Sequence, residues 1–166
     1  MLTAHLPAGY ITGRALAGPT IKAEILWPAL IGGVLPDIDM LYFYLVDQGG
    51  VHHHAYPTHW PLVWVGLCLP LILTAWAAGW PRLCKAFSAF LAGVMVHMLL
   101  DSVGAPVYWL MPFAWGQVEL VEVPARYAHW IISFLLHWTF LLELGIWALA
   151  AFLFFRRPAR RRIFAT

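Results

Sequence analysis

The sequence predicts an all-α integral membrane protein, a helical bundle that forms a single domain over residues 1–166. Two observations lead to this fold class. First, 62% of the residues are hydrophobic and only 11% are charged, whereas a soluble domain is about half apolar and about a quarter charged. Second, the apolar residues gather in stretches near the length of about 20 residues that a membrane-crossing helix needs. We therefore expect three full spans, together with an N-terminal half-inserted hairpin or a fourth span.

Three apolar stretches are the expected spans. The longest is Ile131–Phe155, which would be about 37 Å long as a helix and could cross a bilayer with some tilt. Its strongly polar members are Ser133, His137, Thr139 and Glu143. The second span is Trp60–Trp80, which carries at both ends the residue type that anchors helices at membrane interfaces. The third is Ala86–Val103.

The N-terminal third allows two interpretations. Residues 5–17 and 22–35 are both apolar, but each is only about 20 Å long as a helix, which is short for a full crossing. In the first interpretation they form a hairpin that dips into the membrane and returns, so that His5 and Asp37 lie at the same face. In the second, residues 22–46 make one crossing and His5 is cytoplasmic. We favour the hairpin.

Basic residues predict the orientation of the chain. Arg82 and Lys85 lie between the second and third spans, and basic residues favour the cytoplasmic side of a membrane. A further cluster follows the last span and consists of Arg156, Arg157, Arg160, Arg161 and Arg162. Because this cluster abuts a membrane span, we expect it to bind anionic lipid rather than nucleic acid. The C-terminus is then cytoplasmic, and the segment 104–128 lies outside.

A histidine and an aspartate share one face of the third predicted span. His97 and Asp101 are four residues apart, so their side chains lie one helical turn apart and can reach the same metal ion. A carboxylate in or near hydrocarbon is costly unless it is paired or coordinates an ion. The pair is either a set of metal ligands or a hydrogen bond that ties two helices together.

Two further segments carry residues typical of a metal site. Asp37 and Asp39 lie in the apolar sequence Pro36-Asp37-Ile38-Asp39; we expect one to cap a helix and the other, with Asp39 favoured, to bind metal. Either carboxylate could also steer or deprotonate a water molecule as a catalytic group. The second segment is dense in imidazoles, which are frequent metal ligands. Its histidines are His52, His53, His54 and His59.

Histidine and aspartate together favour zinc or another divalent first-row metal. The number of candidate ligands permits one ion or two. Such an ion lowers the pKa of a water molecule and polarises the bond under attack. Among the remaining residues, Arg126 lies on the predicted outer side and is a candidate for binding a substrate anion. The roles of His129, His137 and Glu143 stay open.

The order of these residues resembles the YdjM-type family of LexA-regulated inner-membrane proteins, which are described as metal-dependent hydrolases. That family has an early histidine, an LPDID block, an HRG-x-THS block and an HxxxD helix. The chain departs from the pattern at Ala55, where the family has Arg, and at Trp60, where it has Ser. The resemblance implies a bacterial inner-membrane location and favours His54 and His59 as ligands, with His53 in reserve.

The layout is also distantly similar to zinc-dependent phospholipase C. That similarity implies hydrolysis of a phosphoester and one ion held by Asp39, His97, Asp101 and a histidine of the tract. The tract histidine is one of His53, His54 and His59. It also implies that His5 serves a second ion. Residues 1–166 would then form one membrane-embedded metal-dependent hydrolase domain whose site faces the outer side.

Two other functions compete with hydrolysis of a lipid or lipid-linked substrate. The first is a non-enzymatic protein that binds or transports metal, which predicts polar ligands at several depths of the membrane. The second is a haem protein with two histidine ligands such as His97 and His137, which leaves the two aspartates of residues 36–39 unexplained. The sequence is silent on the substrate and on the oligomeric state.

Overall fold

The computed structural model describes residues 3–18, 20–48 and 50–156. Its helices, with 3-10 helices written η, are α1 (His5–Ala17), α2 (Ala23–Val34), η1 (Leu35–Ile38), α3 (Asp39–Leu45), η2 (His53–Ala55), η3 (Pro57–His59), α4 (Pro61–Ala77), α5 (Pro81–Asp101), α6 (Trp130–Leu135) and α7 (Phe140–Phe155). Within the described ranges, the only β structure is an isolated bridge between Val107 and Val118. The predicted all-α class is therefore confirmed.

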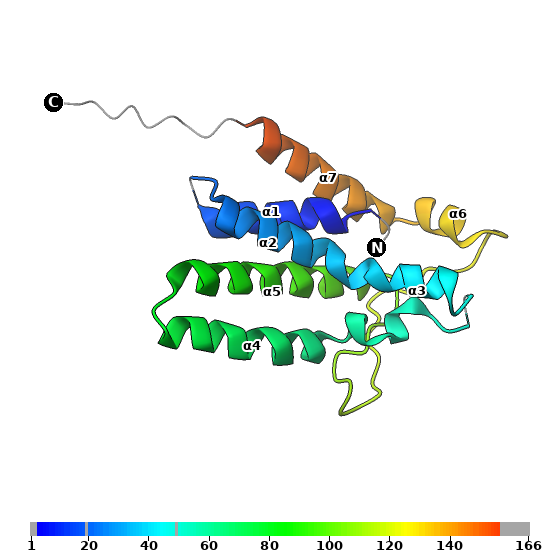
Figure 1. Cartoon of the computed structure of the whole chain (residues 1–166). Coiled ribbons are helices and arrows are strands. Elements are labelled where there is room, and N and C mark those ends of the chain that lie inside the picture. The colour runs from blue at the N-terminus through cyan, green and yellow to red at the C-terminus, as the bar shows by residue number, and fades with distance from the viewer. Residues whose placement is uncertain (1–2, 19, 49, 157–166) are drawn as a thin grey trace.

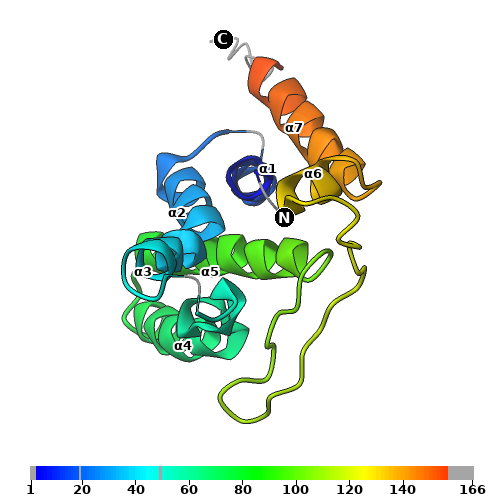
Figure 2. The ribbon, with the colours of Figure 1, turned by 90° about the vertical axis from the view of Figure 1, so that its right-hand side faces the viewer.

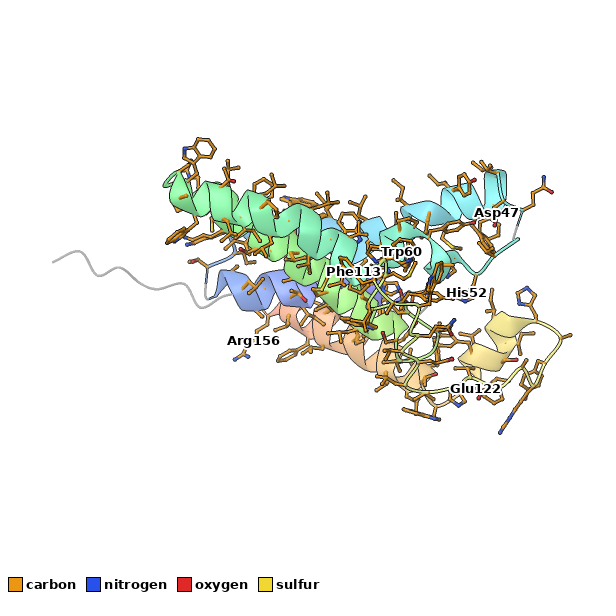
Figure 3. All side chains as sticks on the ribbon, turned by 90° about the horizontal axis from the view of Figure 1, so that it is seen from below. Asp47, His52, Trp60, Phe113, Glu122 and Arg156 are labelled. Carbon is orange, nitrogen blue, oxygen red and sulfur yellow. The ribbon has the colours of Figure 1, made fainter. Side chains whose placement is uncertain are left out.

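The long helices form a bundle whose neighbours run mostly in opposite directions (Figure 1). Helices α1, α2 and α5 pack against one another, α4 covers the other side of α5, and α7 lies against α1 (Figure 2). This topology brings the start of α1, the end of α2 and the end of α5 to one end of the bundle. Asp47, His52 and Glu122 lie toward that end, and Arg156 lies at the opposite end (Figure 3).

Small residues allow α2 and α5 to approach closely. A Cβ atom on Gly32 would lie 2.1 Å from the carbonyl oxygen of Phe90, and one on Gly93 would lie 2.3 Å from that of Ala29. Both separations are far below van der Waals contact, so only glycine fits at these two positions. Small residues at helix interfaces are typical of membrane proteins, where close packing holds helices together.

Among the described residues, two helical stretches are long and apolar enough to cross a membrane. They are Ala23–Leu45, with 23 residues, and Pro81–Asp101, with 21. The second contains most of the predicted span Ala86–Val103. The prediction of three full spans plus a hairpin or fourth span is therefore wrong in number. Within the predicted span Trp60–Trp80, α4 has only 17 residues, because the chain is extended at its start and turns through a positive φ at Gly79.

The predicted span Ile131–Phe155 is also wrong as a single helix. Helix α6 ends at Leu135, and α7 begins only at Phe140 and has 16 residues. The break contains His137 and Thr139, whose side chains lie 3.0 Å apart and hydrogen-bond to each other. Polar side chains that bond locally compete with the hydrogen bonds of a helix.

Each interpretation of the N-terminal third is right in one respect. Helices α2, η1 and α3 follow one another without a gap and make a single stretch over Ala23–Leu45, as the interpretation with one crossing expected. Helix α1 nevertheless returns along α2 and brings His5 to the same end as Asp37, as the hairpin interpretation expected. Of the C-terminal arginines, Arg157, Arg160, Arg161 and Arg162 lie outside the described residues.

Candidate metal centre

Histidine and aspartate side chains from separate parts of the chain meet at the end of the bundle where α1 begins and α5 ends. They are His5 of α1, Asp37 of η1, Asp39 of α3, His53 and His54 of η2, His59 of η3, and His97 and Asp101 of α5. The last two are one turn apart on α5, and His97 Nε2 lies 3.0 Å from Asp101 Oδ2. The i, i+4 spacing thus aims both side chains at one point.

Four atoms form the centre of this cluster: His59 Nε2, His97 Nε2, Asp37 Oδ1 and Asp101 Oδ2. The two nitrogens are 3.3 Å apart. Asp37 lies 3.5 Å from His59 and 3.6 Å from His97, and Asp101 lies 3.6 Å and 3.0 Å from them. Ligands of a tetrahedral zinc ion are about 3.3–3.4 Å from one another, because each lies about 2.0–2.1 Å from the metal. The four atoms therefore fit one small divalent cation.

The burial of these side chains is unequal. The side chains of His59 and His97 are 0% exposed and that of Asp101 is 1% exposed, whereas that of Asp37 is 31% exposed. A buried carboxylate is costly without a positive partner. Three of the four side chains are thus enclosed by protein, and the cluster is open on the side of Asp37.

Almost the entire chain matches a single family. A family model described as YdjM inner membrane protein matches residues 1–163. The chain belongs to the YdjM inner membrane protein family. The predicted resemblance is therefore confirmed, and searches of curated proteins and of solved structures returned no significant match. Family membership and the two candidate spans together identify an inner-membrane protein.

In this YdjM-family protein, Asp39 lies behind His59 rather than among the four central atoms. Its Oδ2 hydrogen-bonds to His59 Nδ1 and accepts a hydrogen bond from Thr58 Oγ1. Burial disfavours the charged form of His59, but the carboxylates of Asp37 and Asp39 outweigh burial and raise its pKa to about 9. The electrostatic field of these carboxylates therefore favours a positive charge at His59. An aspartate bonded to the outer nitrogen of a histidine typically orients that histidine toward a metal.

Backbone carbonyls orient two other histidines of the cluster. His97 Nδ1 hydrogen-bonds to Gly33 O at 2.9 Å, and His54 Nδ1 hydrogen-bonds to Pro106 O at 3.1 Å. In both cases Nδ1 donates to the carbonyl, so Nε2 carries the free lone pair that a metal needs. Burial lowers the pKa of His54 to about 2, which keeps this imidazole neutral.

His5 and His53 lie beside the four central atoms. His5 Nε2 is 3.1 Å from Asp101 Oδ1, and the His5 ring stacks on the ring of His97 with centroids 3.8 Å apart. His53 Nδ1 is 3.8 Å from Asp39 Oδ1. Candidate ligand atoms of His5, Asp37, His97 and Asp101 all lie within 4.8 Å of one another, as do those of His53, His54 and His59. The residues present could therefore serve one ion or two.

The other candidates lie elsewhere. Arg126 is exposed in the segment before α6, and none of the side-chain contacts found among the described residues joins it to the cluster. His52 caps η2 by accepting a hydrogen bond from His54 N. His129 caps α6 in the same way, and His137 bonds to Thr139. Substrate binding by Arg126 stays a prediction.

Two features of the site could not be found from the sequence pattern, and a third could be found only in part. The carbonyl groups of Gly33 and Pro106 have no sequence signal, because any residue supplies a carbonyl. The third is Glu143 of α7, a carboxylate that is 0% exposed. Its signal was its isolation in an apolar helix, where an ionisable residue marks a functional candidate, but its partner could not be predicted.

Proposed function

We propose that this protein is a metal-dependent hydrolase, with zinc as the metal, that cleaves a phosphoester of a lipid or lipid-linked substrate at the membrane surface. The observation that carries the proposal is the meeting of four side-chain atoms from His59, His97, Asp37 and Asp101, which are 3.0–3.6 Å apart in the pairs measured. Two imidazoles with one carboxylate are a frequent ligand set of catalytic zinc.

The residues divide into ligands and a base. We assign His59, His97 and Asp101 as the ligands, because their side chains are at most 1% exposed and meet at one point. Asp37 stands at the remaining corner and is 31% exposed, so water and substrate would reach the site beside it. A bound divalent ion supplies a Lewis acid that polarises the phosphoester and acidifies water.

Asp37 is placed to move the proton during hydrolysis. A water molecule adds to phosphorus, and the bond between phosphorus and the leaving oxygen breaks. Asp37 accepts one proton of the attacking water and gives it to the leaving oxygen, so that the products are a phosphate and an alcohol. Asp39 holds His59 by its Nδ1 and acts on the reaction only through that ligand.

Basic residues support a site on the outer side of the inner membrane. Arg14 near the end of α1, Lys22 before α2, Arg82 and Lys85 at the start of α5, and Arg156 after α7 all lie at the end opposite the cluster. Arg82 lies 3.9 Å from Glu24 at the start of α2, which joins two of these segments. Because basic residues favour the cytoplasmic side, we infer that the cluster faces outward and the described end of α7 inward.

Asparagine at position 37 tests the proposal. Asp37→Asn keeps the size of the side chain and the three buried ligands, so we expect zinc bound as in the unsubstituted protein. Loss of the base is expected to lower turnover about 100- to 10,000-fold. Elemental analysis in detergent gives the zinc content, and a panel of lipid phosphoesters gives the rate. Full activity of a metal-free preparation would rule the mechanism out.

An apolar groove beside the cluster supports a lipid substrate. It has a volume of about 360 Å³ and lies between the end of α5 and α7. Its lining includes Leu100, Val103, Leu141, Leu142, Gly145 and Ile146. Leu100 immediately precedes Asp101 in α5, so the groove lies near the end of α5 that carries this member of the cluster. The gathering of the ligands at one end also supports a surface site rather than a transport path through the membrane.

A tryptophan at position 145 is expected to block this groove. A Cβ on Gly145 would meet nothing within 4 Å, so Gly145→Trp can fill the groove without a backbone clash. We expect kcat/KM for a long-chain phosphoester to fall about 10-fold or more, while hydrolysis of a short-chain substrate with the same head group is unchanged. Leu144→Trp, at a neighbouring position that is 49% exposed, is the control. Equal losses for both chain lengths would contradict a chain-binding groove.

A further inference from the structure

Glu143 is an unusual residue for its position in α7. Its side chain is 0% exposed, and its neighbours in the helix are almost all apolar: the helix reads FLLELGIWALAAFLFF. An ionisable side chain in such a place costs free energy that its partners must offset. The residues bonded to Glu143 therefore indicate why a carboxylate is present there.

One partner of Glu143 is Thr3. The backbone nitrogen of Thr3 donates to Glu143 Oε2 at 3.0 Å, and its hydroxyl donates to the same oxygen at 2.8 Å. Trp147, one turn further along α7, donates from Nε1 to Thr3 Oγ1 at 3.1 Å. Two residues of α7 thus hold one residue of the N-terminal segment through both its backbone and its side chain.

Thr3 lies two residues before His5, the first residue of α1. The N-cap residue of this helix is Ala4, which has no side chain able to cap, and the helix start has no side-chain cap. The tie to Glu143 therefore takes the place of a local cap in fixing where α1 begins. From the first turn of α1, the His5 side chain places Nε2 3.1 Å from Asp101 Oδ1, and its ring stacks on the ring of His97.

We propose that Glu143 is a positioning residue of the metal centre: by holding Thr3, it fixes the start of α1 so that His5 reaches Asp101 and His97. The contacts form a continuous series from α7 through Thr3 and His5 to two of the assigned ligands. This inference rests on the proposed function, because it assumes that His97 and Asp101 bind the ion. Mutation of a residue that orients a metal ligand typically lowers the metal affinity about 10- to 100-fold.

A double-mutant cycle on zinc affinity tests this role. We expect Glu143→Gln to weaken zinc binding about 10-fold, because the neutral amide accepts the hydrogen bonds of Thr3 more weakly than the charged carboxylate does. In the His5→Ala background, Glu143→Gln is expected to change the affinity less than about twofold, because the group it positions is already gone. Zinc affinity is measured by competition with a chelator, and the visible spectrum of the cobalt-loaded protein reports the geometry of the ligands.

Substitutions of Thr3 keep the test valid if Glu143→Gln fails to fold. Thr3 is exposed, so Thr3→Val removes only the hydroxyl, whereas Thr3→Ser retains it. We expect Thr3→Val to weaken zinc binding severalfold, whereas the Thr3→Ser protein should bind zinc as tightly as the unsubstituted protein. Leu144→Ala is the control on the exposed face of α7.

The outcomes separate the two proposals. If the unsubstituted protein binds no zinc, the metal centre itself is wrong. If it binds zinc and Glu143→Gln has the same affinity, or loses as much in the His5→Ala background as alone, Glu143 does not act through His5 and the positioning role is overturned.

Discussion

Replacing His97 with alanine is expected to remove zinc from the protein and abolish hydrolysis. The free energy of binding zinc is about 10–16 kcal/mol in zinc-finger peptides, so the loss of one of the three assigned ligands should weaken binding at least about 100-fold. Removing this side chain also leaves Gly33 O without its hydrogen bond from Nδ1. Zinc content after dialysis, measured by elemental analysis, and hydrolysis of a lipid phosphoester are the two measurements.

Leu99→Ala is the matched control for His97→Ala. Leu99 lies two residues away on α5 but is 54% exposed, so its truncation should leave zinc binding unchanged. Asp101→Ala should behave like His97→Ala, because Asp101 Oδ2 lies 3.0 Å from His97 Nε2. Retention of zinc by both ligand variants, with an intact fold, would show that the four atoms are not a metal site.

Alanine at position 93 is expected to destabilise the bundle strongly. A Cβ at this position would lie 2.3 Å from Ala29 O and 3.0 Å from Gly33 N, both backbone atoms that cannot move aside alone. Overpacking typically costs about 1–3 kcal/mol. A clash with two backbone atoms is expected at the upper end of this range, which corresponds to about 10 °C in the midpoint of thermal unfolding. Because α2 must retreat from α5, Gly33 O would also leave His97. We expect weaker zinc binding in the fraction that still folds.

Gly66→Ala provides a control of opposite sign. A Cβ on Gly66 would meet nothing within 4 Å, and alanine is favoured over glycine inside a helix by about 0.5–1 kcal/mol. The substitution on α4 should therefore raise the unfolding midpoint slightly, while Gly93→Ala lowers it. Thermal unfolding in the same detergent compares the two. Equal midpoints would mean that α2 and α5 are not in close contact at Gly93.

The spans show where sequence patterns fail. The apolar stretch Ile131–Phe155 is long enough to cross a membrane, but the structure breaks it at His137 and Thr139, whose side chains bond to each other. Hydropathy measures whether a segment tolerates lipid and contains no information about such local bonds. The stretch Ala23–Leu45 passes through Pro36 and two glycines without a gap, because η1 takes Pro36 at its start.

The two aspartates illustrate the same limit at the site. Asp37 and Asp39 are two residues apart, so in a helical segment their side chains point in widely different directions. The sequence could predict different roles for them and favoured Asp39 as the ligand. In the structure Asp37 Oδ1 is among the four central atoms, and Asp39 bonds to the outer nitrogen of His59. Whether Asp39 ever binds metal stays a prediction, and we assign it the supporting role.

The sequence alone was sufficient for the helical class, the family, the apolar composition that suits a membrane and the residue types of the candidate metal site. These depend on composition, on short motifs and on the i, i+4 spacing of His97 and Asp101, all of which are local. Only the tertiary structure decided how Asp37, His59, His97 and Asp101 meet, and that Glu143 holds Thr3. These contacts join residues up to 140 positions apart, and they depend on helix packing at glycines whose close neighbours no local pattern identifies.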